Sequence, residues 1–200
     1  MKIIDKIKSC GGYISTEELN PQEYQQLVYQ VKKGTIKRLK SGLYYLEDYE
    51  YEVTRDLNKI VPNGVLCMWS AWEYYGYTDS YAHGNHLAVC GTYKIMLPDY
   101  PIIKLYHKNK KMYELGKTED VTDTGTKIMI YDRERCVCDA IKFRKQIGID
   151  VSSEILNNYL ADKEHCDVNK LMKCAEMMKC SQFLKNIIQY KYEQLAPNNC

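Results

Sequence analysis

The first fifty residues hold the feature that most constrains the fold, which is a fixed order of short helices followed by a pair of strands. Apolar residues at helical spacing open the chain over residues 3–8, and a pair of glycines at residues 11–12 ends that segment. A longer helix is predicted over Pro21–Lys33, because Asn20 can cap it and proline fits its first turn. Its apolar face is expected to comprise Tyr24, Leu27, Val28 and Val31, which recur at helical spacing. Gly34 follows as a suitable C-terminal stop.

Two further signals complete this order. The stretch Ser15–Leu19 carries a capping box, with Glu18 three residues after Ser15, and predicts a short helix before the long one. Beyond the long helix, residues 35–39 and 43–46 predict a β-hairpin with glycine in its turn. Three short helices followed by a hairpin is the order of a winged helix-turn-helix. In that fold one helix enters the major groove of DNA and the hairpin lies along the backbone or the minor groove.

The predicted long helix and hairpin carry side chains suited to DNA. Glutamine can bond bidentately to adenine, whereas lysine and arginine neutralise phosphates and fix the register without reading the sequence. We expect four side chains of the helix to contact base edges of a double-stranded operator, namely Gln22, Gln25, Gln26 and Tyr29. We expect five cations at the helix end and in the hairpin to contact phosphates, namely Lys32, Lys33, Lys37, Arg38 and Lys40.

The positive charge of the chain is concentrated in this segment. The formal net charge of the whole sequence is +2, which taken as an average argues against a basic nucleic-acid binder. Residues 1–46 hold eight cations and four acids, a balance of +4, and the remaining residues hold 20 cations and 22 acids, a balance of −2. DNA binding by the N-terminal part is therefore compatible with the composition. Two other interpretations stay open, because such modules also mediate protein contacts and cations at a helix end compensate its dipole.

The rest of the chain predicts a second domain of the α+β class. A helix is expected over residues 51–60 at its start. Apolar runs that favour strands are separated by turn-rich segments and lie at residues 86–90, 102–106 and 127–131. The pattern then becomes helical, with helix starts expected at Asp132, at Ser152 or Ser153, at Asp167 and at Ser181. Strands followed by a run of helices are typical of an α+β fold. We predict a winged helix-turn-helix over residues 1–50 and a mixed α/β domain that ends in a helical run over residues 51–200.

The sequence carries no convincing pattern for catalysis, a cofactor or a metal. It lacks a Gly-x-x-x-x-Gly-Lys phosphate loop and a Gly-x-Ser-x-Gly elbow, and no lysine has an acid two residues before it, as one class of metal-dependent nuclease requires. The nine cysteines include no Cys-x-x-Cys pair, and His83 and His86 lack matched partners for zinc. We expect a protein that is not an enzyme and binds no cofactor or metal.

The same sequence predicts a cytoplasmic protein with reduced cysteines and no membrane partner. The longest apolar run, Val65–Trp69, is far shorter than a membrane span, and the first residues lack the apolar core of a signal peptide.

The densest charged motif follows the last predicted strand and comprises Asp132, Arg133, Glu134, Arg135 and Asp139. One interpretation is a capped helix start with an ion pair between residues 135 and 139, which are one helical turn apart. The other is a buried charge network that shapes a surface for a partner or a ligand. The first is favoured because surface pairs are common and individually weak.

Four stretches carry a resemblance to a known family. They read GYISTEEL over residues 12–19, KGTIKRLKSGLY over 33–44, SAWEYYGYTD over 70–79 and YDRERCVCD over 131–139. Together they resemble the AbiEi family of antitoxins, which belong to bacterial type IV toxin–antitoxin and abortive infection systems. That family usually has threonine after the motif arginine, where this chain has Cys136. The resemblance extends over residues 1–195.

The resemblance implies a DNA-binding transcriptional regulator that represses its own operon and acts as an antitoxin in phage defence. The toxin would be a nucleotidyltransferase-like protein encoded alongside, and its neutralisation need not involve a stable complex. The charged motif would belong to the antitoxin domain. The alternative is a winged-helix targeting module fused to an uncharacterised enzyme or a protein-interaction domain. A pocket lined by His83, His86, Arg133 or Arg135 would favour the enzyme.

Overall fold

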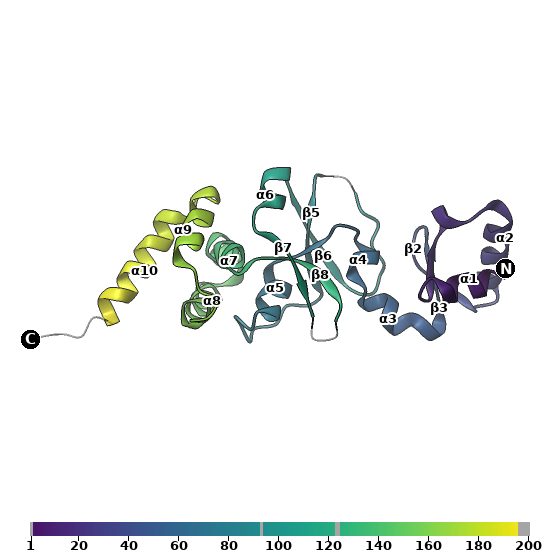
Figure 1. The fold of residues 1–200 in the computed structure, drawn as a ribbon, viewed down its shortest axis with the longest axis horizontal. Helices are drawn as coiled ribbons and strands as arrows, with labels where there is room; N and C mark the ends of the chain where they lie inside the picture. Colours follow the sequence, from purple (N-terminus) through teal and green to yellow (C-terminus); the bar gives the residue numbers. More distant parts are fainter. Residues whose placement is uncertain (1, 93, 123–124, 196–200) are drawn as a thin grey trace, which may run out of the picture. The chain divides into compact units, whose positions relative to one another are not determined.

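The computed structural model describes residues 2–92, 94–122 and 125–195 and has a mixed α+β fold with a helical C-terminal run (Figure 1). The chain divides into two compact units. The first comprises Met1–Gly64 with Thr92–Lys104, and the second comprises Val65–Gly91 with Leu105–Cys200. The boundary predicted between residues 50 and 51 falls inside the first unit.

The first unit combines short helices with a small antiparallel sheet of strand order β1-β3-β2. In this sheet Ile14 lies opposite Tyr44, and Lys37 lies opposite Tyr45. In chain order its elements are α1 (Ile3–Ser9), β1 (Tyr13–Ser15), the 3-10 helix η1 (Thr16–Glu18), α2 (Pro21–Lys32), β2 (Ile36–Lys40), β3 (Leu43–Leu46), the 3-10 helix η2 (Glu47–Tyr49), α3 (Glu50–Arg55) and α4 (Leu57–Ile60).

The core of the first unit is aliphatic and draws on both helices and strands. Its fully or almost fully buried side chains are Ile3, Ile7, Ile14, Leu27, Ile36 and Leu46. Gly12 joins α1 to β1 at a φ of +89°, and a Cβ placed on it would overlap the ring of Tyr49. This glycine therefore permits both the left-handed turn and the close approach of Tyr49.

Three details of the first unit differ from the sequence-based expectation. Ser15 accepts a hydrogen bond from the amide of Glu17, two residues on, so a single 3-10 turn forms in place of a capped α-helix. On α2, Leu27 is buried but Tyr24 and Val28 remain 45% and 37% exposed, so the apolar face is narrower than its spacing predicted. The helix expected over residues 51–60 is broken at Asp56, which caps α4.

The second unit is built on a five-stranded mixed sheet of order β6-β5-β4-β8-β7. β4 pairs parallel with β8 and antiparallel with β5, and β7 and β8 form an antiparallel pair. The elements of the sheet region are β4 (Val65–Leu66), α5 (Met68–Tyr74), β5 (Asn85–Cys90), β6 (Ile103–Lys108), α6 (Lys110–Glu114), β7 (Lys117–Val121) and β8 (Lys127–Tyr131). The helical run comprises α7 (Arg133–Ile147), α8 (Ile149–Ala161), α9 (Val168–Met177) and α10 (Ser181–Leu195).

The core of the second unit joins the sheet to the helical run. Trp72 of α5 is fully buried, and its indole Nε1 donates a 2.9 Å hydrogen bond to the carbonyl of Cys136 in α7. Tyr131, Val137, Leu156 and other buried residues of β8, α7 and α8 share the same core. Because α7 follows directly from β8, its first two turns are buried and carry the motif of residues 132–139 into the core.

The helix starts of the second unit were partly predicted. Asp132 and Asp167 cap α7 and α9, as expected. Ser152 is buried inside α8, which begins at Ile149 after Gly148, a residue with a φ of +100°. Ser181 is the first residue of α10 rather than its cap, because the amide of Leu184 donates to the carbonyl of Cys180.

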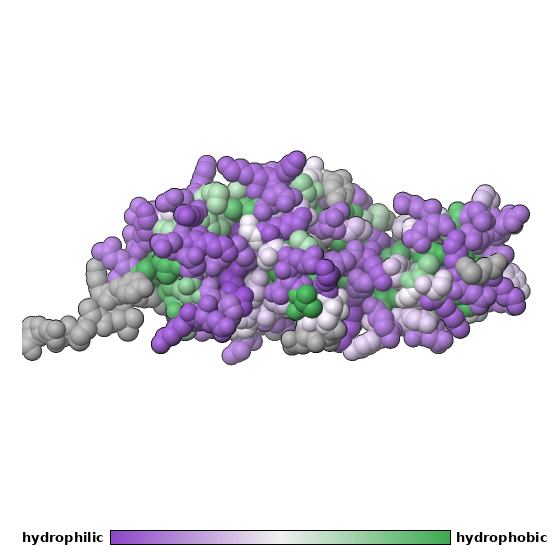
Figure 2. Space-filling model, viewed as in Figure 1, coloured by the Kyte–Doolittle hydropathy of each residue, from purple (hydrophilic) through white to green (hydrophobic). Residues whose placement is uncertain are grey.

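The surface of each unit is mostly hydrophilic on the face drawn in Figure 2, and hydrophobic residues reach it in small patches. Among the described residues, no helix combines the length and apolar character needed to cross a membrane.

Candidate functional site

The first candidate site is the exposed face of α2, which a complete capping box orients. The amide of Glu23 donates to the side chain of Asn20 at 2.9 Å, and the amide of Asn20 donates to the carboxylate of Glu23 at 3.0 Å. Lys6 of α1 forms a 2.8 Å ion pair with the same carboxylate. These contacts fix the start of α2 against α1, and burial of Leu27 sets which side of the helix faces solvent.

The side chains predicted to read bases lie on the exposed side of α2. Gln22, Gln25 and Gln26 are exposed, and Tyr29 is 55% exposed. Lys33 at the helix end places its Nζ 4.7 Å from the centre of the Tyr29 ring. The side-chain oxygen of Gln26 accepts a 3.1 Å hydrogen bond from the amide of Ile3, so this glutamine also holds the start of α1.

The cations predicted to contact phosphates have unequal surroundings. Lys32, Lys33 and Arg38 are exposed. Lys37 instead pairs with Glu47 at 2.8 Å and with Glu50 at 3.7 Å, and the hydrogen bond to Glu47 is the main cause of a raised Lys37 pKa.

Lys40 is also engaged within the first unit. Its Nζ donates a 2.6 Å hydrogen bond to the carbonyl of Ile60, and burial lowers its pKa. Arg38 is exposed and donates only a long hydrogen bond, 3.4 Å from its Nε to the Lys40 carbonyl. The structure therefore leaves Lys32, Lys33 and Arg38 as the best-placed cations of the predicted interface, because Lys37 and Lys40 would first have to break shorter internal contacts.

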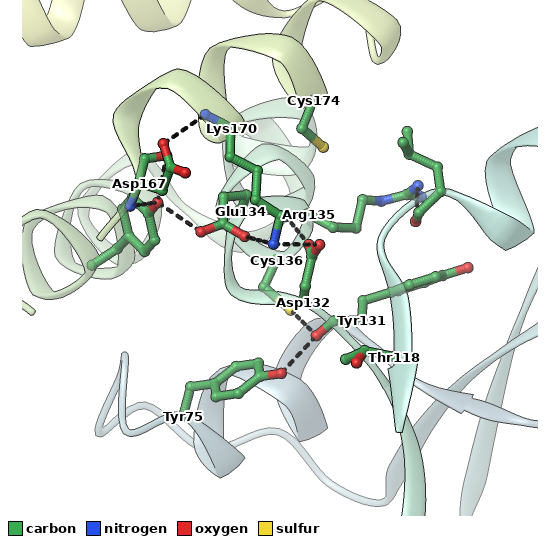
Figure 3. A network of polar contacts seen from close by, with 12 residues as sticks. Tyr75, Thr118, Tyr131, Asp132, Glu134, Arg135, Cys136, Asp167, Lys170 and Cys174 are labelled. Atoms are coloured by element: carbon green, nitrogen blue, oxygen red, sulfur yellow. Dashed lines mark hydrogen bonds and ion pairs between the residues drawn. The ribbon is translucent and has the colours of Figure 1, made fainter. Parts of the chain in front are cut away.

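The second candidate site is a buried network of charges at the start of α7 (Figure 3). Arg135 and Asp139, one turn apart, are 1% exposed and form a 3.1 Å ion pair. Arg135 also donates to the carbonyl oxygens of Met112 and Leu115, at 2.9 and 3.3 Å. Burial disfavours its charge, but the attraction of Asp139, its hydrogen bond and the nearby Tyr131 together outweigh burial and raise the pKa of Arg135.

The Arg135 guanidinium lies between this ion pair and an aromatic ring. Its central carbon is 4.6 Å from the centre of the Tyr131 ring, and the Tyr131 hydroxyl donates to the same Met112 carbonyl at 3.4 Å. Gly116 lies against Arg135 and Asp132, since a Cβ on this glycine would come within 2.7 Å of the Arg135 side chain and 2.8 Å of Asp132 Oδ1. The arginine thereby ties α7 to α6 and to the turn that follows α6.

Glu134 carries the network to α8 and α9. It is 3% exposed, accepts a 2.9 Å hydrogen bond from the Tyr159 hydroxyl and pairs with Lys170 at 2.6 Å. Lys170 also contacts Asp132 at 3.0 Å (Figure 3). Burial disfavours the Lys170 charge, but its two acidic partners outweigh that effect and raise its pKa. The Tyr159 hydroxyl in turn accepts from the amide of Asp167 at 2.8 Å.

The two remaining positions of the motif point in different directions. Arg133 stacks on Tyr75, 4.4 Å from the ring centre, and lies 3.6 Å from Asp162. Cys136, which stands where the resembling family usually has threonine, is buried and its thiol donates to the carbonyl of Tyr131 at 3.4 Å. A buried thiol at this position satisfies a backbone group and does not face solvent.

The motif is thus a capped helix start and a buried charge network at once. The predicted pair of residues 135 and 139 exists, but it is in the core rather than on the surface, where we expected it. Arg133, Asp132 and Lys170 reach solvent, with side chains 26%, 20% and 52% exposed, so a partner or ligand could touch the network at these three groups.

Several residues of this network could not be found from the sequence. Tyr159, Lys170 and the carbonyls of Met112 and Leu115 come from other elements, and no local pattern links them to residues 132–139. The nearest sequence signal is the cap at Asp167, which starts the helix that carries Lys170.

The histidines weighed as ligands are not brought together as a metal site. His83 is exposed beside the ring of Tyr81, whereas His86 is buried and its Nδ1 lies 2.9 Å from the Tyr106 hydroxyl. Within the described part of the chain, no group of three or more His, Cys, Asp or Glu side chains is placed to hold a metal ion.

Neither a protein-family model nor a curated protein sequence matches the chain.

Proposed function

We propose that the first unit is a winged helix-turn-helix that binds double-stranded DNA through the exposed face of α2. The observation that carries this proposal is the stripe formed by Gln22, Gln25 and Tyr29, which recur at helical spacing on that face, with Lys33 beside the tyrosine. Glutamine amides can read adenine, and an exposed tyrosine adds a polar and aromatic contact.

The charge of this segment supports the same proposal. Residues 20–46 contain five cations and a single acid, Glu23. The carboxylate of Glu23 is occupied by Lys6 and by the amide of Asn20, so the α2 face presents positive charge at Lys32 and Lys33. Such a positively charged face attracts the negatively charged phosphate backbone of DNA by long-range electrostatics.

The test is a salt titration of binding to the DNA upstream of the chain's own coding sequence, followed by fluorescence anisotropy. Arg38→Ala removes one phosphate contact. It should lower the slope of log affinity against log salt by about one unit and weaken binding to all DNA sequences alike. Gln25→Ala should instead weaken binding to the specific site by about 1–3 kcal/mol and leave non-specific binding unchanged.

The matched control is Lys145→Ala, which removes the same charge from an exposed position on α7 in the second unit. It should leave the salt slope unchanged. If the slope falls equally for Arg38→Ala and Lys145→Ala, the effect depends only on the net charge of the chain. The hairpin would then not be part of the DNA interface.

We further propose that the chain is an autorepressing antitoxin of the AbiEi type, which opposes a nucleotidyltransferase-like toxin encoded alongside. This part is supported by the four resembling stretches, of which residues 131–139 form the buried network of α7. Co-expression with the neighbouring gene should restore growth. Arg38→Ala should relieve repression but retain rescue, because the second unit would oppose the toxin. Loss of rescue in that variant would contradict this division of labour.

One observation favours a second candidate, in which α2 contacts a protein. Tyr24 and Val28, one turn apart on α2, are 45% and 37% exposed although they are apolar. A double change to serine should disrupt such a contact and spare DNA binding, since neither residue belongs to the glutamine stripe. Sedimentation of the unchanged chain and of this double variant, each with and without operator DNA, separates the two functions.

A further inference from the structure

A cavity in the second unit gathers three cations around one space. Its volume is about 410 Å³, and it is open to solvent. The lining comes from α7, from the turn between α9 and α10 and from the first turn of α10, and its polar and aromatic members are Lys142, Arg144, Lys179, Gln182 and Phe183. No described acid belongs to this lining.

The three cations are not neutralised within the described part of the chain. No carboxylate described there lies within ion-pairing distance of Lys142, Arg144 or Lys179. Lys170 of the same unit, by contrast, pairs with two acids. An anion that enters the cavity is therefore attracted by all three cations and displaces no internal partner.

Arg144 is held in place for such a contact. Its central guanidinium carbon lies 3.9 Å from the centre of the Phe183 ring, and its Nη1 donates a 2.8 Å hydrogen bond to the carbonyl of Ile141. A guanidinium carries five N–H donors in one plane, and Ile141 is the one described acceptor for this group. The remaining donors can bind a phosphate bidentately, and little side-chain freedom is lost because the arginine is already ordered.

Lys179 occupies a backbone position that favours glycine. Its φ is +60°, and it lies in the turn that ends α9, where the amide of Cys180 donates to the carbonyl of Ala175 at 2.9 Å. Glycine or asparagine is usual at the left-handed residue of such a turn, because a Cβ there destabilises it. No ion pair or hydrogen bond of the lysine ammonium to another described residue offsets this cost, and its side chain lines the cavity. A strained residue that serves a binding site has this character.

We propose that this cavity binds the diphosphate group of a small organic ligand, such as a nucleoside diphosphate, through Lys142, Arg144 and Lys179. Three cations exceed what one phosphate group needs, since a single phosphate carries about two negative charges at neutral pH. The volume lies within the range of roughly 300–1,000 Å³ that small-molecule sites occupy, so there is room for an organic part beside the phosphates. Phe183, which is 38% exposed, offers that part an aromatic contact.

The test is isothermal titration of the full-length chain at low salt with ADP, and separately with pyrophosphate and with adenosine. ADP and pyrophosphate should compete for one site, ADP should bind more tightly, and adenosine should not bind. Lys142→Gln should weaken ADP binding about tenfold, because it removes one charged hydrogen bond. The matched control is Lys145→Gln, which removes an exposed charge of α7 outside the lining and should leave the affinity unchanged.

Lys179→Gly separates the ligand contact from folding. Glycine relieves the left-handed backbone, so this variant should melt no lower than the unchanged chain, whereas its affinity for ADP should fall about tenfold. A lysine with only a structural role would not give the second change. Unchanged affinity in both Lys142→Gln and Lys179→Gly would overturn the proposal.

Three other results would also count against it. Failure of both ADP and pyrophosphate to bind would remove the anion site, and equal affinity for the two would remove the organic part of the ligand. Displacement of ADP by duplex DNA would make the cavity part of a nucleic-acid surface instead. None of these results bears on DNA binding by the first unit, which the salt titration tests separately.

Discussion

Replacing Asp139 by asparagine isolates the contribution of the buried charge in the α7 network. The change keeps the size of the side chain and one oxygen that can accept from Arg135 Nε, which now lies 3.1 Å from Asp139 Oδ2. It removes the negative charge. Arg135 would then remain 1% exposed with two backbone carbonyls and the ring of Tyr131 around its guanidinium and no counter-charge from Asp139.

The expected loss can be worked from these contacts. Breaking a buried pair by removing one partner costs about 3–5 kcal/mol, because the remaining charge is stranded in the core. One hydrogen bond of about 1 kcal/mol can survive through the asparagine oxygen, and the two carbonyl bonds are unchanged. We therefore expect the free energy of unfolding of the second unit to fall by about 3 kcal/mol, which corresponds to a melting temperature lower by roughly 6–12 °C.

The assay is urea unfolding followed by tryptophan fluorescence. The chain has two tryptophans, Trp69 and Trp72, and both lie in α5 of the second unit, so the signal reports that unit. Trp72 is fully buried against α7, which makes the signal sensitive to this region.

The control is an exposed pair in the same unit. Lys127 and Glu119 lie 2.7 Å apart with side chains 74% and 53% exposed, so Lys127→Gln should leave the free energy of unfolding nearly unchanged. A loss for Asp139→Asn no larger than that of the control would refute the argument from burial. Replacing both Arg135 and Asp139 by apolar residues of similar volume should recover most of the lost stability.

Two further predictions concern backbone strain and pH. Gly116→Ala should lose about 1–3 kcal/mol more stability than Gly76→Ala in the same fluorescence assay, because both glycines have positive φ but a Cβ meets Arg135 only at Gly116. The hydrogen bond from Lys6, followed by the amide of Asn20, lowers the pKa of Glu23 below 4.5. Its contribution to stability is therefore present above pH 4.5 and is lost as the pH falls through the folded-state value. Urea unfolding of the first unit, followed by circular dichroism, should show this loss of stability at acid pH. Glu23→Gln should abolish the pH-dependent loss.

The features that the sequence could predict are those set by neighbouring residues. The caps at Asn20, Asp132 and Asp167 were predicted because a side-chain oxygen meets an amide two or three residues away, which is a local event. The hairpin of β2 and β3 was predicted for a similar reason, because glycine at position 42 permits the turn.

The features that could not be predicted depend on distant partners. β7 was missed because its sequence, KTEDV, is charged, and it forms by pairing with β8 at the edge of the sheet. The burial of Arg135 was missed because its partners at Met112 and Leu115 are carbonyl groups, which leave no trace in the residue pattern.

Contacts between distant residues also limit how many cations of the proposed DNA interface can contact phosphates. A count of side chains gives five cations for phosphates, which would produce a salt slope of about 4.5 per bound chain. The ion pairs of Lys37 with Glu47 and Glu50, and the bond of Lys40 to the Ile60 carbonyl, reduce this number to three. We therefore expect a slope of roughly 3 per chain. A slope near the higher value would mean that DNA displaces both internal contacts. Glu47→Gln, which removes the shorter of the two ion pairs of Lys37, would then leave the slope unchanged instead of raising it.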